Sequence, residues 1–344
     1  MKTGPFAVFL LVFSCLFTSA ATGLSPTAAA DDAPPGYRLL IYYGIPKAVN
    51  HVWDENRAAE IFAQYDVLVF GENLEEPTHP HHHSTQHVLS FARRIKPHIR
   101  VYGYVDLGVT TVNHSMAALK DKVRKWKALG ADGIFLDDAG FDYGVSRARL
   151  NETVRYVHEL GLSAFVNAWD PDDVMGSAVH PLYNPNGAAT ALDRRDIYLL
   201  EDFLLPTDIN AGNSPSAFHP SFREKMDASL RYRTQLGVKL MSVSSIDYTR
   251  YTPLALRKFF RLNEVTAGVF SLDAYGIAPL HYSADERGRD EVRFFPYITN
   301  YWDYYTTNIT YIAKYHNRDF SRGGFRIHSL PGDHYYLFPE TVHY

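Results

Sequence analysis

Short runs of β-branched and aromatic residues alternate along the chain with amphipathic stretches of helical period. This alternation is typical of repeated βα units around a parallel sheet, whose buried strands read as apolar runs. The pattern predicts eight strands, at residues 37–43, 66–70, 99–105, 133–136, 163–167, 197–200, 239–243 and 268–272. It predicts helices at residues 54–65, 84–95, 115–129, 146–160, 220–236 and 252–266.

Helix start and stop signals support this division. Ser146 stands at a cap position and Pro253 at a first helical position. Glycine ends three of the predicted helices, at Gly130, Gly161 and Gly237. Eight such units within residues 37–285 predict an α/β protein with a (β/α)8 TIM barrel. An open doubly wound sheet is the alternative, but residues 42–46 lack its glycine-rich phosphate turn.

Residues 1–22 have the three parts of a secretory signal peptide: Lys2, an apolar stretch at 6–17, and small residues at 19–21. The apolar stretch falls short of the ~20 residues that span a bilayer. A lipoprotein anchor at Cys15 is disfavoured, because the preceding residues make a poor lipobox. We therefore expect a secreted, extracellular protein, with residues 23–36 as a flexible leader.

Composition narrows the function classes. The 344 residues are 46% hydrophobic, as in globular proteins, and the net charge of -4 gives no footprint for nucleic acid or an anionic membrane. Cys15 is the one cysteine, so the mature chain has no thiol nucleophile, zinc-thiolate site or disulfide. No Gly-x-Ser-x-Gly elbow of a serine hydrolase occurs.

The last part of the chain, residues 286–344, is rich in Tyr and Phe and is predicted to complete or cap the barrel. Within it, residues 325–330 and 334–338 predict a β-hairpin. The aromatic side chains either pack a core or form a sugar-stacking platform. Acceptor sequons for glycans begin at Asn113, Asn151 and Asn308.

The residues that follow the predicted strands are mostly acidic, and in βα barrels the chemistry occurs at that end. They are Glu72, Asp106, Asp137, Asp138, Glu201, Asp202, Asp247 and Asp273. Any one of them can be a helix cap or a solvated charge. A rim crowded with carboxylates raises their pKa values, however, and therefore indicates a functional site.

Two chemistries use such a rim: metal-dependent hydrolysis, and glycoside hydrolysis by a pair of carboxyl groups. The histidines cluster at residues 79–87 and no strand ends in His-x-His, so we expect no metal and no cofactor. Asp137 and Glu201 follow the fourth and sixth strands, where carboxyl groups can lie about 5 to 9 Å apart, as in glycosidases. We expect Glu201 to be the protonated acid and Asp137 to stay ionised.

Further rim residues are predicted to bind the substrate. Aromatic rings suit the apolar faces of sugars, and amides or carboxylates suit hydroxyl and amino groups. The predicted binding residues are Tyr43, Glu72, Tyr104, Asp106, Asp138, Asn167, Trp169, Asp247, Asp273 and Tyr275. Each aromatic residue can equally pack the top layer of the barrel.

The segment Gly133-Ile134-Phe135-Leu136-Asp137-Asp138, the preceding strand at 101–105 and the pair Val166-Asn167 resemble the barrel glycosidases grouped around spherulin-4 and the endo-alpha-1,4-polygalactosaminidases. The resemblance implies an extracellular, metal-free hydrolase of galactosamine-type exopolysaccharides. It implies Asp137 as nucleophile or stabiliser and Glu201 as general acid/base. The chain has Asp137-Asp138 at the place where one branch of this group has Asp-Glu. It also lacks the Pro-Asp-Asn sequence of the other branch.

Two further functions stay open on the sequence alone: a non-catalytic carbohydrate-binding barrel, and a metal-dependent hydrolase that uses the histidines at 79–87. We expect a monomer whose partner is a polysaccharide. The sugar, the linkage, the stereochemical course and the choice between Asp137 and Asp138 as the catalytic aspartate stay open.

Overall fold

A computed structural model describes residues 37–206, 221–270, 272–282, 291–293, 324–329 and 334–339. The predicted signal peptide, the leader, the Asn308 sequon and most of the aromatic extension lie outside these residues. Strands β9 (Gly324–Ser329) and β10 (His334–Pro339) pair antiparallel, which confirms the pairing expected of the hairpin. No helix within the described residues is both long and apolar enough to cross a membrane.

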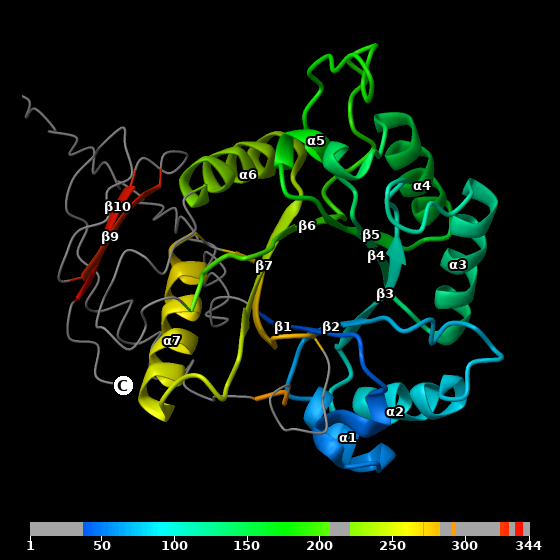
Figure 1. Cartoon of the computed structure of the whole chain (residues 1–344), viewed down its shortest axis with the longest axis vertical. Coiled ribbons are helices and arrows are strands. Elements are labelled where there is room, and N and C mark those ends of the chain that lie inside the picture. The colour runs from blue at the N-terminus through cyan, green and yellow to red at the C-terminus, as the bar shows by residue number, and fades with distance from the viewer. Residues whose placement is uncertain are drawn as a thin grey trace, which may run out of the picture. The chain divides into compact units, whose positions relative to one another are not determined.

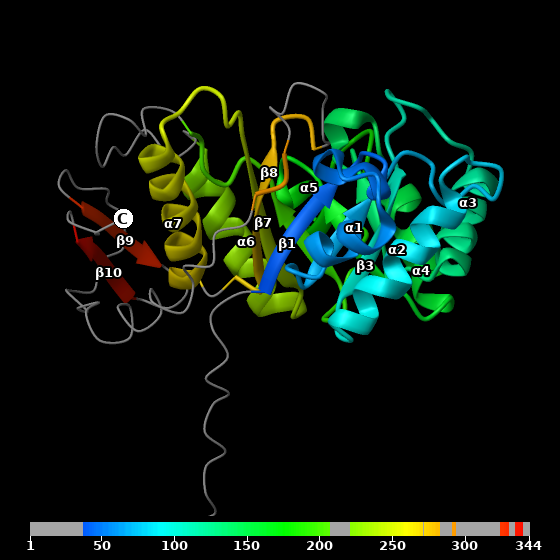
Figure 2. The same ribbon diagram turned by 90° about the horizontal axis from the view of Figure 1, so that it is seen from below.

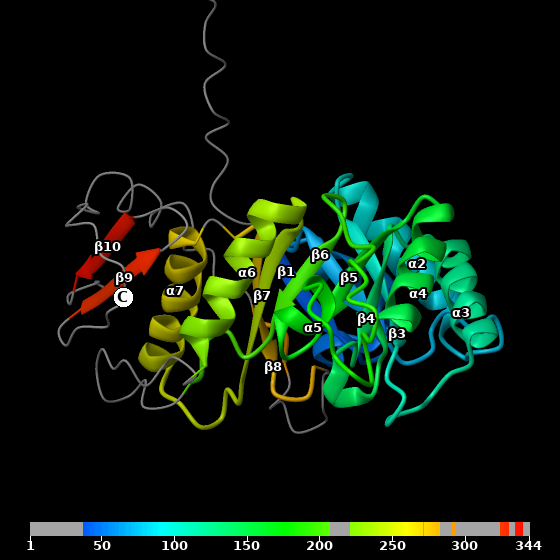
Figure 3. The ribbon, with the colours of Figure 1, turned by 90° about the horizontal axis from the view of Figure 1, so that it is seen from above.

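Eight parallel strands form a closed barrel with each strand beside its neighbour in sequence, and helices surround it (Figure 1). The strands are β1 (Tyr37–Tyr42), β2 (Val67–Phe70), β3 (Arg100–Asp106), β4 (Gly133–Asp137), β5 (Ser163–Asn167), β6 (Ile197–Leu200), β7 (Lys239–Ile246) and β8 (Ala274–Pro279). The barrel closes where β1 pairs with β8 (Figure 2), and β4, β5 and β6 stand side by side in Figure 3. The predicted (β/α)8 TIM barrel is confirmed.

The helices follow the predicted order. They are α1 (Glu55–Phe62), α2 (His82–Ile95), α3 (Met116–Leu129), α4 (Arg147–Glu159), α5 (Pro171–Met175), α6 (Phe222–Leu236) and α7 (Pro253–Val269), with 3-10 turns η1 (Pro46–His51) and η2 (Phe141–Tyr143). Ser146 caps α4 by accepting the N–H of Arg149, and Gly130 and Gly237 end α3 and α6 in the left-handed conformation. Only the short α5 was not predicted, because five residues are too few for a helical period.

The core has two layers, because successive strand residues point to opposite faces. Residues such as Ile41, Val69 and Phe135 fill the barrel interior, while Leu40, Leu68 and Ile134 pack outward against the helices. Asn151 also lies in this packing: it is 4% exposed, and its side-chain amide bonds to the backbone of Ala189 and Ala191. The Asn151 sequon is therefore buried in the folded chain, whereas Asn113 is exposed.

An aspartate precedes each even-numbered strand and bonds to the odd-numbered strand before it. The side chains of Asp66, Asp132, Asp196 and Asp273 accept the N–H groups of Arg38, Val101, Ala164 and Leu240 at 2.8, 2.8, 2.8 and 2.9 Å. Each acceptor stands directly before its strand, and each donor is the second residue of the previous strand. These four bonds therefore tie neighbouring strands together at the N-terminal mouth of the barrel.

The predicted eighth strand at 268–272 is wrong. Helix α7 continues to Val269, and β8 begins at Ala274. A short apolar run on the buried side of a helix cannot be told from a strand by its hydrophobicity alone. Asp273 therefore stands before β8 and not after it, and Tyr275, near the start of β8, packs in the outer core layer. Both residues lie at the N-terminal end of the barrel, away from the rim to which the sequence assigned them.

Candidate active site

Three polar side chains meet where β4, β5 and β6 end. Asp137 and Asn167 are the last residues of β4 and β5, and Glu201 directly follows β6. The side-chain amide nitrogen of Asn167 donates to Asp137 Oδ1 and to Glu201 Oε2, both at 2.8 Å. These two carboxyl oxygens are thus separated by at most twice that distance. The structure brings together the pair that the sequence singled out, with one amide between them.

Asp137 is the most strongly perturbed carboxyl of this group. Burial raises its pKa to about 7, and the neighbouring charges of Asp138 and Glu201 add to the shift, while the bond from Asn167 opposes it. The free site therefore keeps a proton on Asp137 up to neutral pH. This differs from the expectation of an ionised Asp137, because the sequence does not show how deeply this side chain is desolvated.

Each member of the pair is followed by an aspartate in the left-handed backbone conformation. The φ angles are 52° at Asp138 and 49° at Asp202, a region that costs free energy for residues other than glycine but that aspartate tolerates. The pKa of Asp138 is raised to about 6 by burial, by Asp106 and by Glu201. Strained backbone and crowded carboxyl groups at one place are typical of functional sites.

Three tyrosines form one wall of the site. The ring of Tyr43 contacts those of Tyr104 and Tyr282, with ring centres 5.1 and 5.5 Å apart. The Tyr104 hydroxyl bonds to Asp137, and the Tyr282 hydroxyl donates to Glu201 Oε1 at 3.3 Å. Burial, reinforced by these carboxyl groups, raises the pKa of all three hydroxyls, so they remain hydrogen-bond donors. Tyr282 was missed by sequence reasoning because it lies beyond the misplaced eighth strand.

Trp169 and Lys225 lie beside Glu201. Trp169, in the loop after β5, is 40% exposed, and the Lys225 ammonium lies 4.2 Å from the centre of its ring. Both line a small pocket with Glu201 and Phe222. Trp169 therefore lies beside Glu201, and its predicted role in substrate binding stays a prediction. Lys225 was not predicted, because no periodic or motif signal sets it apart from other helix-surface lysines.

Three predicted binding residues have other surroundings. Asp106 is buried and orders the loop after β3, accepting from Gly108 N and Thr111 Oγ1, both at 2.7 Å. Its charge raises the pKa of Asp138 and of Tyr104. Asp247 follows β7 and accepts from the backbone N–H and the hydroxyl of Thr249. Glu72 is an exposed loop residue with φ 56°. None of the three has a described hydrogen bond to Asp137 or Glu201.

The histidines at 79–87 do not converge. His79 accepts the N–H of His81, the buried His82 bonds to Leu74 O, and His87 pairs with Glu55 at 3.0 Å. Within the described residues, this segment therefore offers no group of three ligand atoms.

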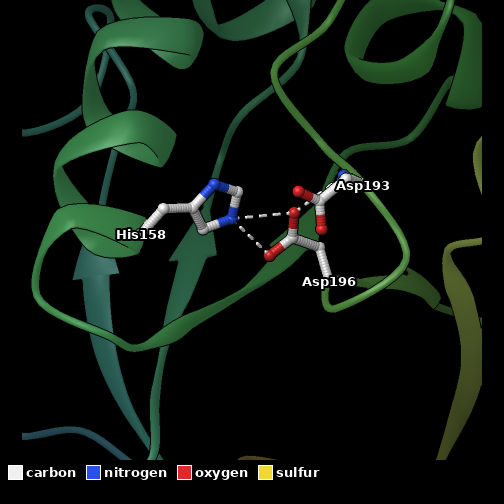
Figure 4. A group of neighbouring side chains, drawn as sticks. All are labelled: His158, Asp193 and Asp196. Atoms are coloured by element: carbon white, nitrogen blue, oxygen red, sulfur yellow. Dashed lines mark hydrogen bonds and ion pairs between the residues drawn. The ribbon is translucent and has the colours of Figure 1, made fainter.

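One group of three possible ligands does occur in the described part of the chain: His158, Asp193 and Asp196, whose ligand atoms lie within 4.8 Å of one another (Figure 4). Hydrogen bonds to the Asp196 carboxylate account for the close approach of these side chains. His158 Nε2 lies 2.8 and 3.0 Å from the two Asp196 oxygens, which also accept the N–H groups of Ala164 and Asp193. The cluster is thus part of the strand-tying network at the N-terminal mouth.

No known family model and no curated protein matches the chain. Among solved structures, Aspergillus clavatus Sph3 in complex with GalNAc is 12% identical, with 79% of this chain and 97% of that chain covered and a TM-score of 0.41. A 3-dehydroquinate dehydratase from Geobacillus kaustophilus is 13% identical (80% and 93% covered, TM-score 0.41). Haloferax volcanii malate synthase is 10% identical (72% and 68% covered, TM-score 0.42). At this level of similarity, only the residues of the site itself bear on function.

Proposed function

We propose that the protein is a secreted glycoside hydrolase that cleaves a polysaccharide with Asp137 and Glu201. The observation that carries the proposal is the single Asn167 amide that holds one oxygen of each carboxyl at 2.8 Å. Glycoside hydrolysis requires two carboxyl groups whose different surroundings keep one protonated and the other ionised. The tyrosine wall and Trp169 supply the flat apolar surfaces on which sugars stack.

In the proposed reaction, Glu201 donates its proton to the glycosidic oxygen as the bond to the anomeric carbon breaks. The Asp137 carboxylate attacks that carbon and forms a glycosyl ester. Glu201 then takes a proton from water, which attacks the same carbon and releases Asp137. The short separation of the pair supports this two-step course, with retention of configuration, because inverting enzymes keep their carboxyl groups about 6.5 to 9.5 Å apart.

For this reaction Asp137 must be ionised, although burial raises its pKa to about 7. Positive charge that develops on the sugar ring beside Asp137 favours the ionised form of that carboxyl. An amino sugar would supply such a charge from the start. The crowding of Asp137, Asp138 and Glu201, which raises the pKa of the two aspartates, therefore supports a galactosamine-type exopolysaccharide as substrate.

The test is incubation of the purified protein with a panel of amino-sugar and neutral polysaccharides, followed by an assay for new reducing ends. Asp137→Asn and Glu201→Gln should each lower kcat by about a hundredfold or more, since each removes an acid/base or nucleophilic group. Asp121→Asn and Glu60→Gln make the same chemical changes on the outer helices and should leave kcat unchanged. Full activity in either site variant would refute the pair, and glycan binding without cleavage would indicate a carbohydrate-binding barrel instead.

A further inference from the structure

Lys225 occupies an unusual place for a lysine. It lies in the first turn of α6, is 9% exposed, and its ammonium donates to the carbonyl oxygen of Glu201 at 3.3 Å. The same ammonium lies 4.2 Å from the centre of the Trp169 ring. It therefore joins three segments: the loop after β5, the end of β6 and the start of α6.

The surroundings compensate the burial of this charge. An ammonium removed from water costs free energy unless partners replace its hydration. Here the partners are a carbonyl oxygen, an aromatic face and the carboxylates of Glu201 and Asp202 from the end of β6, Asp170 from the loop after β5, and Asp142 from the turn after β4. Burial lowers the pKa of Lys225 to about 8 and these carboxylates oppose the shift, so the group is charged at neutral pH.

We propose that Lys225 is a positioning residue that holds the ring of Trp169 beside Glu201, where the ring forms the wall of a sugar subsite. The inference rests on the proposed function, because it assigns the ring to the sugar next to the general acid. A tryptophan that is 40% exposed on a loop has alternative rotamers, and an ammonium held over one ring face selects among them. Its bond to Glu201 O fixes the same ring relative to the acid.

Tryptophan fluorescence tests the placement without any need for activity. The chain has four tryptophans, so the spectrum of Trp169 is obtained by subtracting that of W169F from that of the parent protein. In the parent, the Trp169 emission should change as the pH passes through the pKa of Lys225, about 8. K225M should abolish this transition, and K225R should remove the titration while keeping the emission of the low-pH form, because a guanidinium stays charged.

Kinetics and binding test the role of the ring. On the glycan that the parent cleaves, K225M should lower kcat/KM about tenfold, mainly through KM, and K225R should recover most of the loss. Affinity of the same glycan for the inactive D137N protein should fall by a similar factor when K225M is added. If K225M does not fold, the kcat/KM values of K225R and W169F are compared with that of the parent protein instead.

The placement of Trp169 by Lys225 is wrong if K225M keeps the fluorescence transition, and the role of the ring in the sugar subsite is wrong if K225M keeps the parental kcat/KM. The proposal is also wrong if K225R behaves like K225M in kcat/KM, since the effect would then come from packing and not from charge. Failure of the proposed function is a separate result: a parent protein that cleaves no glycan refutes the hydrolase, while the fluorescence transition alone still decides whether Lys225 holds Trp169.

Discussion

At the scale of single residues, the site is built from carboxyl groups that are costly to keep together. Asp137 has a pKa of about 7 and Asp138 of about 6, in each case chiefly because of burial, with neighbouring carboxylates adding to it. An aspartate whose pKa is raised on folding binds its proton more tightly in the native state than in the unfolded chain. Ionisation of these groups therefore opposes folding.

This gives a prediction for stability against pH. Above pH ~4 the unfolded chain loses the Asp137 proton while the native state keeps it, so the free energy of unfolding falls as the pH rises toward 7. Asp137→Asn removes that ionisation and should raise the free energy of unfolding by up to about 4 kcal/mol at pH 8, but little near pH 4, since the pKa rises from 3.8 to about 7 and each pKa unit corresponds to about 1.4 kcal/mol. Urea unfolding at both pH values measures the difference.

The control for this prediction is Asp121→Asn. Lys125 and Arg124 lower the pKa of Asp121, so its removal should give no gain in stability at high pH. An Asp137→Asn protein that is no more stable than the parent at pH 8 would show that Asp137 is not held in the strained, desolvated state described above.

At the scale of elements, the packing of α3 on β3 depends on one missing side chain. The Trp126 ring lies against Gly103 so closely that a Cβ at that position would come within 2.0 Å of it, and the indole N–H donates to Tyr104 O at 2.9 Å. Tyr104 is the strand residue whose hydroxyl bonds to Asp137. The glycine thus lets a fully buried tryptophan support the strand that carries part of the tyrosine wall.

Gly103→Ala should therefore lower the free energy of unfolding by about 1–3 kcal/mol, the usual cost of overpacking. In a Trp126→Leu background the same substitution should cost much less, because the ring that the methyl group meets is gone. A double-mutant cycle by urea unfolding measures this coupling. Equal costs in both backgrounds would contradict the contact.

The strands and helices differ in how well the sequence predicts their positions. Seven of the eight strands were predicted correctly, because each strand ends where its apolar run gives way to polar loop residues. The prediction of these strand ends also identified Asp137, Asn167 and Glu201. The eighth strand was misplaced because α7 ends in an apolar run that resembles a strand. As a result, Asp273 and Tyr275 were assigned to the C-terminal mouth of the barrel, and Tyr282 was not recognised as a site residue. Lys225 could not be predicted, since its role depends on which helix turn faces the end of β6.

At the scale of the whole molecule, the two mouths of the barrel use carboxyl groups in opposite ways. At the N-terminal mouth, Asp66, Asp132, Asp196 and Asp273 each accept a backbone N–H from a neighbouring strand. At the C-terminal mouth, burial and neighbouring carboxylates, Glu201 among them, raise the pKa of both Asp137 and Asp138. This division is what βα barrels show generally, with stability at one end and chemistry at the other.

Asp273 distinguishes the two roles. If it ties β7 to β8 through Leu240 N at 2.9 Å, Asp273→Ala leaves that N–H without its acceptor and should lower the free energy of unfolding by about 1–3 kcal/mol, with kcat and KM unchanged below the unfolding transition. Asp132→Ala, which breaks the equivalent bond to Val101 N, should behave in the same way. Urea unfolding and the reducing-end assay on the same preparations measure both quantities. A loss of turnover without a loss of stability in Asp273→Ala would return this residue to the catalytic rim, and the position of β8 would then have to be wrong.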